Sequence, residues 1–136
     1  LSAEGQNLKL TTTEEMGAYF LDLFFGQRSE VMYQVCLDGK GKVLCCRRLS
    51  EGGASAAECS VRRVVEIALR CNAVGVVLAH NHPSGLALPS REDYVATSQV
   101  TEALSAIGVR LVDHIIVADQ DFVSMAENGS IAQRCF

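Results

Sequence analysis

The feature that most constrains the fold is the continuous apolar run of residues 73–79, which leads directly into His80-Asn81-His82-Pro83-Ser84-Gly85. A short run without alternating polar residues is typical of a strand buried on both faces of a sheet. Such a strand needs helices packed on both sides, so the run favours an α/β protein. The polar turn that follows, for which Gly85 supplies backbone freedom, ends the strand where α/β proteins commonly place their sites.

Hydrophobic periodicity predicts the elements around this strand. Helices are expected from a Thr13 cap to Gly26, over 61–72 after a Ser60 cap, and over 91–107 before Gly108. Strands are expected over 30–37 and 42–49, joined by a hairpin turn at 38–41, and over 109–117 and 122–124. Residues 50–59 are expected to form a loop. The order α-β-β-α-β-α-β-β predicts an α/β fold, a mixed β-sheet with flanking helices.

Length and composition indicate one globular domain over residues 1–136. Hydrophobic residues make up 49% of the chain, and only two prolines occur, so a disordered chain is not expected. The net charge of −4 argues against a broad basic face for nucleic acid. Neither a signal peptide nor an apolar run of about 18 residues is present, so we expect no membrane span and a cytoplasmic location.

The six cysteines are consistent with a reducing compartment. No C-x-x-C pair occurs among them, and several fall within apolar runs. We therefore expect free thiols that pack as small hydrophobic side chains rather than bind metal or carry out redox chemistry. These residues are Cys36, Cys45, Cys46, Cys59, Cys71 and Cys135.

Two histidines separated by one residue indicate a metal site. At the end of a strand, His80 and His82 point to the same side, and neutral imidazole is a good zinc ligand. Asp93 follows in the first turn of the next predicted helix and supplies a third ligand. Three protein ligands leave one position open for water, which is typical of catalytic zinc, and bound zinc lowers the pKa of that water to about 7.

The histidines, Ser90 and Asp93 also fit more ordinary structural roles. A single histidine is more often structural than metal-binding, but the pair with a following aspartate favours a metal. Ser90 and Asp93 also fit an N-terminal capping box. We expect the backbone of Ser90 to cap while its hydroxyl faces the site. For Asp93 the two roles compete, since one carboxylate hardly serves the backbone and a metal equally well, and we prefer the ligand role.

The pattern His-x-His, seven residues, Ser, two residues, Asp resembles the JAMM motif of JAB/MPN metalloproteases, with His80, His82, Ser90 and Asp93 in the four motif positions. The surrounding sequence is similar to the RadC-like (UPF0758) branch of this family. The similarity extends over nearly the whole chain, in segments 79–85, 89–93, 113–117 and 123–127. The resemblance implies a JAB/MPN fold with a layout like that of cytidine deaminases. It also leads to the expectation that the helix-hairpin-helix segment which usually precedes this domain is absent.

The resemblance further implies roles for individual residues. The family uses an upstream glutamate at the start of a strand to position and deprotonate water; Glu30 matches that place, with Glu66 and Glu58 as competitors. Ser90 would donate a hydrogen bond to the developing oxyanion. His114 is a candidate contact to a metal-binding histidine, although a core role is the preferred alternative.

The sequence therefore predicts a metallohydrolase with one Zn²⁺ that cleaves peptide or isopeptide bonds in a polypeptide substrate, such as an extended or isopeptide-linked tail. The alternatives are a metal-binding interaction module without protease activity and, from the RadC name, a module associated with DNA repair. DNA association is not expected from this domain alone, and the oligomeric state stays open. Neither H-E-x-x-H nor the deaminase signature H-x-E with P-C-x-x-C occurs in the chain.

Overall fold

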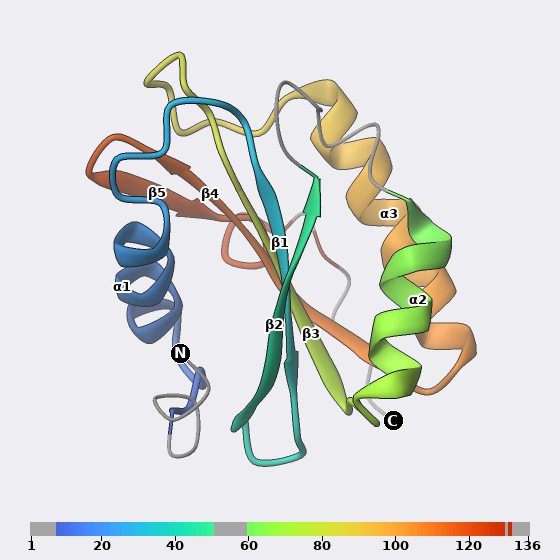
Figure 1. Cartoon of the computed structure of the whole chain (residues 1–136). Helices are drawn as coiled ribbons and strands as arrows, with labels where there is room; N and C mark the ends of the chain where they lie inside the picture. Colours follow the sequence, from blue (N-terminus) through green and yellow to red (C-terminus); the bar gives the residue numbers. More distant parts are fainter. Residues whose placement is uncertain (1–7, 51–59, 130, 132–136) are drawn as a thin grey trace.

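The structure is a computed structural model that describes residues 8–50, 60–129 and 131. In these residues a five-stranded sheet carries three helices, in the predicted order (Figure 1). The elements are α1 (Thr13–Leu23), β1 (Met32–Leu37), β2 (Val43–Ser50), α2 (Val61–Arg70), β3 (Gly75–Asn81), α3 (Arg91–Ala106), β4 (Arg110–Ala118) and β5 (Asp121–Ser124).

The sheet has the strand order β2-β1-β3-β4-β5. Only β3 and β4 run parallel, joined through α3, whereas the other neighbouring pairs are antiparallel. The predicted α/β class and mixed sheet are therefore confirmed. All seven residues of β3 are buried, as the continuous apolar run predicted, because this strand lies at the centre of the sheet.

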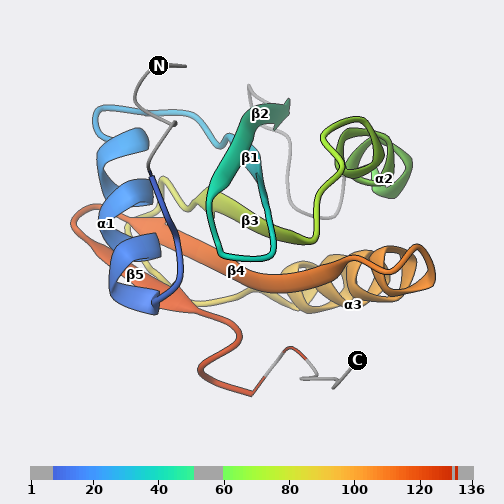
Figure 2. The ribbon, with the colours of Figure 1, turned by 90° about the horizontal axis from the view of Figure 1, so that it is seen from below.

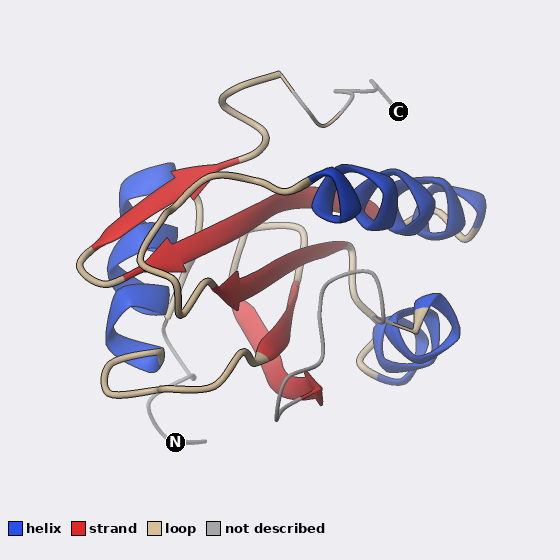
Figure 3. Cartoon of the chain, turned by 90° about the horizontal axis from the view of Figure 1, so that it is seen from above, coloured by secondary structure: helices blue, strands red, loops and turns tan. Residues whose placement is uncertain are grey.

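The helices cover both faces of the sheet (Figures 2 and 3). On one face α1 packs through Phe20 against side chains of the central strands, among them Val35 and Val77. On the other face α2 and α3 cover Val76 and Leu78 of β3 with their own apolar side chains. Successive residues of β3 therefore alternate between the two cores, so position in the strand decides which helix each side chain meets.

Two of the three helix N-caps are the residues that the sequence predicted, and the third differs. Ser60 and Ser90 cap α2 and α3 as expected. The cap of α1 is Thr12 rather than Thr13, because its hydroxyl accepts from the Glu15 backbone N–H while the Glu15 carboxylate accepts from Thr12 N–H. This reciprocal pair satisfies two backbone donors at once and fixes the start one residue earlier.

The predicted loop over 50–59 lies outside the described residues, except for residue 50, which ends β2. Within the part of the chain that the structure describes, no helix is both long and apolar enough to cross a bilayer.

Candidate metal centre

The candidate site lies where β3 ends and the following loop leads into α3, at the upper end of the sheet in Figure 1. His80 occupies the penultimate position of β3 and, by the alternation of the strand, points to the face that carries α2 and α3. Asp93 lies in the first turn of α3, and its side chain reaches His80 from above the same face. His82 follows the end of the strand. Its backbone N–H donates to Val117 O of β4, which ties the loop to the sheet.

The three predicted ligands converge on a common point. His80 Nε2 lies 2.9 Å from His82 Nε2 and 3.2 Å from Asp93 Oδ1, and His82 Nε2 lies 3.3 Å from Asp93 Oδ2. A tetrahedral zinc ion with ligands at about 2.0–2.1 Å would hold them about 3.3 Å from one another. The observed spacings are within a few tenths of an ångström of that value, so the group fits a zinc-sized ion.

The tautomer of His82 suits a ligand. Its Nδ1 lies 3.0 Å from the carbonyl oxygen of Leu86, and a carbonyl oxygen can only accept, so Nδ1 carries the proton. In the neutral ring Nε2 then presents its lone pair toward His80 and Asp93. The turn that brings Leu86 back is closed by Gly85, whose φ of 90° is the positive φ expected of this residue.

A chain of hydrogen bonds orients His80. Its Nδ1 lies 2.8 Å from His114 Nε2, and His114 Nδ1 lies 2.7 Å from Thr97 Oγ1. The Thr97 hydroxyl donates to Met125 Sδ at 3.6 Å, so it accepts from His114 Nδ1–H. His114 Nε2 must then accept from His80 Nδ1–H, which leaves His80 Nε2 free for a metal. Such outer hydrogen bonds set the tautomer and ring angle of metal-binding histidines.

His114 is fully buried in the core and also contacts a candidate ligand, so its two proposed roles are compatible. Burial, reinforced by the nearby His80 ring, lowers the pKa of His114 to about 3. A neutral ring is the form that the chain of hydrogen bonds requires. Thr97, which no sequence motif indicated, lies one helical turn after Asp93, and this spacing of four residues is the signal that could have identified it.

We expect Thr97→Val to weaken zinc binding by about 10-fold or more, within the range of about 10–100-fold typical of lost outer hydrogen bonds. Valine keeps the shape of threonine but offers His114 Nδ1–H no acceptor. The measurement is the zinc Kd from competition with a chromophoric chelator. Thr97→Ser retains the hydroxyl and serves as the control. Equal zinc affinity of the valine variant and the parent chain would show that this chain of hydrogen bonds does not tune the site.

The carboxylate of Asp93 serves the helix cap and the imidazole pair at the same time. Its Oδ2 accepts from Ser90 N–H at 2.7 Å while both oxygens lie against the histidines. The carboxylate thus makes the capping bond, and because it has two oxygens and about four acceptor positions, a ligand role beside the cap stays a prediction. Burial raises the pKa of Asp93, but the close contacts with the His80 and His82 rings, together with the hydrogen bond from Ser90 N–H, outweigh it and hold the pKa well below its usual range. The group is a carboxylate at neutral pH.

The prediction that the backbone of Ser90, and not its hydroxyl, caps α3 was wrong. The hydroxyl itself makes the cap, because Ser90 Oγ accepts from Asp93 N–H at 3.1 Å. A hydroxyl that accepts a hydrogen bond still has its own proton to donate. Ser90 lines the same pocket as Asp93 and His82, so its hydroxyl remains close to the site while it caps α3.

Glu30 lies just before β1, half-buried, and lines this pocket together with His82 and Asp93. The Asp93 hydrogen bond raises the pKa of His82, burial opposes the rise, and the charge of Glu30 adds a smaller increase. The competing Glu66 is exposed on α2, where it pairs with Arg62 at 3.5 Å, and Glu58 lies outside the described residues. Of the two described candidate glutamates, only Glu30 therefore lines the pocket.

Asn81 holds the segment that carries Glu30, a role that the sequence pattern did not indicate. Its side-chain amide donates to Ser29 O at 3.0 Å, and its Oδ1 accepts from Val31 N–H at 2.7 Å. The residue is buried, and its two bonds bracket Glu30 in the chain. The strand that supplies His80 thus also fixes the backbone of the candidate base. Only the pairing of β1 with β3 brings these segments together.

The pocket has a volume of about 680 Å³ and combines polar and apolar walls. Glu30, His82, Ser90 and Asp93 supply the polar side, while Leu86 and Leu88 of the loop before α3 lie largely exposed at its rim. A second hollow of about 800 Å³ borders His82 on its other side, between the end of α1 and Asp119.

The chain is similar to known proteins over most of its length. The sequence model described as the RadC-like JAB domain matches residues 10–130. A UPF0758 protein of Photobacterium profundum is 38% identical over 88% of this chain and 54% of its own length. A UPF0758 protein of Alcanivorax borkumensis is 36% identical over 93% of this chain and 56% of its own length. The chain spans about half the length of the curated relatives it matches, and their names state no activity.

Proposed function

The chain belongs to the RadC-like JAB domain family, and we propose that it is a zinc-dependent hydrolase of peptide or isopeptide bonds that works in the cytoplasm. One observation carries the proposal: two imidazole nitrogens and one carboxylate converge at 2.9–3.3 Å with their lone pairs facing one another. Such a group is electrostatically unfavourable unless a proton or a cation lies between its members. The match to zinc spacing makes a metal ion the better occupant.

The roles divide among six side chains, three of which would hold the metal. His80, His82 and Asp93 would hold one zinc ion, which would supply activation of water and polarisation of the scissile carbonyl. Glu30 takes a proton at its carboxylate and returns it to the leaving amine. Ser90 donates its hydroxyl proton to the carbonyl oxygen as charge develops there. Asn81 keeps the Glu30 backbone in place through its two hydrogen bonds.

A polypeptide is the substrate class that the surroundings favour. The exposed Leu86 and Leu88 offer apolar contacts at the rim of a pocket that contains the candidate catalytic groups. An extended chain or an isopeptide-linked tail can present one carbonyl to these groups while its flanking side chains cover the rim. A compact charged substrate would leave the two leucines without contacts.

Two other functions remain as outcomes of the test. A metal-binding interaction module would keep the three ligands without turnover. A DNA-repair role is favoured only by the family name, and the net charge of −4 opposes contact between this domain and a phosphate backbone.

The test is cleavage of peptide and isopeptide libraries by the zinc-loaded chain, with products identified by mass spectrometry. We expect cleavage that a chelator abolishes and zinc restores. Zinc-loaded protein that leaves every library uncut would support the interaction module. A salt-dependent shift of duplex or branched DNA in a gel, without peptide cleavage, would support the DNA-associated role.

A further inference from the structure

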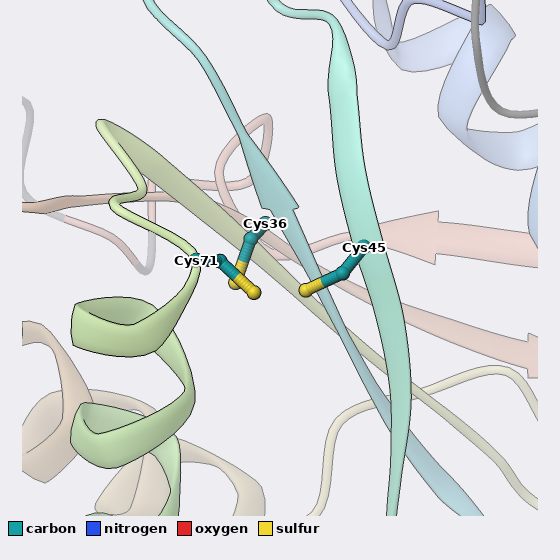
Figure 4. A group of neighbouring side chains, drawn as sticks. All are labelled: Cys36, Cys45 and Cys71. Atoms are coloured by element: carbon teal, nitrogen blue, oxygen red, sulfur yellow. The ribbon is translucent and has the colours of Figure 1, made fainter.

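Three cysteines that lie far apart in the sequence meet between the sheet and the end of α2. Cys36 of β1 stands directly opposite Cys45 of β2 in the antiparallel register. Cys71 is the C-cap residue of α2. Figure 4 shows the three side chains pointing toward one another, and their sulfurs all lie within 4.8 Å of one another. The cluster lies apart from the His80 site, which is at the other end of β1: Met32, rather than Cys36, pairs with His80.

The surroundings favour negative charge on one sulfur of this three-cysteine cluster: contact with Cys45 and burial raise the pKa of Cys36, burial and Cys45 raise the pKa of Cys71, and Cys45 is shifted the other way. The side-chain amide of Gln34 donates to Cys36 Sγ at 3.6 Å. The Cys36 thiol donates to Cys45 and, with help from Cys71 and the Arg47 charge, lowers the pKa of Cys45 to about 6 against the effect of burial. Thiolate is the form of cysteine that binds metals, and binding of the metal itself releases the thiol proton.

The geometry is close to that of a thiolate metal site. Zinc–sulfur bonds of about 2.3 Å in a tetrahedron place sulfurs about 3.8 Å apart. Sulfurs within 4.8 Å therefore need to approach by about 1 Å at most. Cys36 is buried, whereas Cys45 and Cys71 are half-exposed, so an ion can enter from solvent and a fourth ligand position stays open.

We propose that Cys36, Cys45 and Cys71 form a second metal site, which binds one thiophilic divalent ion of the zinc class through three sulfurs. Three thiolates select soft or borderline ions over magnesium or calcium. The ion would tie the C-terminal end of α2 to the β1–β2 hairpin. Among the described residues, these elements also meet through apolar packing and a hydrogen bond from Gln34 to Val64 O. The proposal is independent of hydrolysis at the His80 site.

The probe is Co²⁺, added to the full chain kept reduced with a phosphine. Sulfur bound to Co²⁺ gives a charge-transfer band in the near ultraviolet that nitrogen and oxygen ligands do not give. We expect a saturable band in the parent chain that zinc displaces. Cys45→Ser and Cys71→Ser should lose it. His80→Ala should keep it, which separates this site from the proposed catalytic one.

Cys46→Ser is the matched control. Cys46 is the next residue of β2, but it packs on the opposite face of the sheet with the core around α1. Its replacement should leave the band unchanged, as should replacement of Cys59 and Cys135 together. Far-ultraviolet circular dichroism of each variant checks that the fold is retained.

A second measurement needs no variant. One equivalent of zinc beyond that held by the His80 site should protect Cys45 and Cys71 of the parent chain from alkylation, as read by mass spectrometry, and leave the reactivity of Cys46 unchanged. The proposal is overturned if the parent chain shows no band and no protection. It is equally overturned if the band survives in Cys45→Ser and Cys71→Ser, or if it depends on Cys59 and Cys135.

Discussion

We expect Glu30→Gln to bind zinc as tightly as the parent chain and to lose hydrolysis by a factor of about 10²–10⁴. Glutamine keeps the size of the side chain and its place before β1, where Asn81 holds the backbone on both sides. It lacks a basic oxygen at neutral pH, so no group at this position can take a proton from water or return one to the leaving amine. The measurements are the zinc Kd and kcat/KM on a substrate that the parent chain cuts.

Glu66→Gln is the control for this result. Glu66 is the other described candidate, but it lies exposed on α2 in an ion pair with Arg62, so its replacement should leave kcat/KM within about 2-fold of the parent value, since exposed pairs contribute little. If Glu30→Gln cleaves as fast as the parent chain, Glu30 is not the base. A loss of activity in the Glu66 variant alone would reassign the proton transfer to α2.

The second large effect is expected from Asp93→Asn, which should weaken zinc binding at the His80 site by more than the about 10–100-fold that a lost outer hydrogen bond costs. Asparagine can still accept from Ser90 N–H through its carbonyl oxygen, so the cap of α3 survives. The negative charge that faces the two imidazoles is lost, however. A neutral amide oxygen is a far weaker ligand for a divalent ion than a carboxylate.

Thermal unfolding measures this loss of zinc affinity without a substrate. Zinc at about 1,000 times its Kd stabilises a one-site protein by about 4 kcal/mol, and for a chain of this size Tm should rise on the order of 10 °C. In the Cys45→Ser background, which removes the proposed second site, we expect this rise for otherwise unchanged protein and little or none after Asp93→Asn.

Glu92→Gln is the matched control for Asp93→Asn. Glu92 is an exposed acid in the same first turn of α3 and lines the same pocket, so it shares the helix dipole with Asp93 without touching the histidines. The Glu92→Gln variant should keep the full zinc-dependent rise in Tm. An Asp93→Asn chain that gains as much from zinc as its control would remove residue 93 from the ligand set.

Local sequence patterns were sufficient to predict the helices and strands of this protein and its candidate metal ligands. The alternation of turn signals and apolar periods predicts the order of eight elements, because propensity, capping and hydrophobic period act over a few residues. The same holds for His80, His82 and Asp93, whose spacing spans one strand end, one turn and one helix start. Burial of β3 followed from its uninterrupted apolar run, since a strand without polar positions has no face to offer to water.

Tertiary structure alone decided which distant residues meet. His114 and Thr97 complete the chain of hydrogen bonds to His80 only because β4 pairs parallel to β3 in one register, and α3 crosses above both. Asn81 brackets Glu30, and Cys36 meets Cys45 and Cys71, for the same kind of reason. Strand order and register arise from packing of the whole core rather than from the period of any one segment, and a shift of one residue would turn each of these strand side chains to the other face.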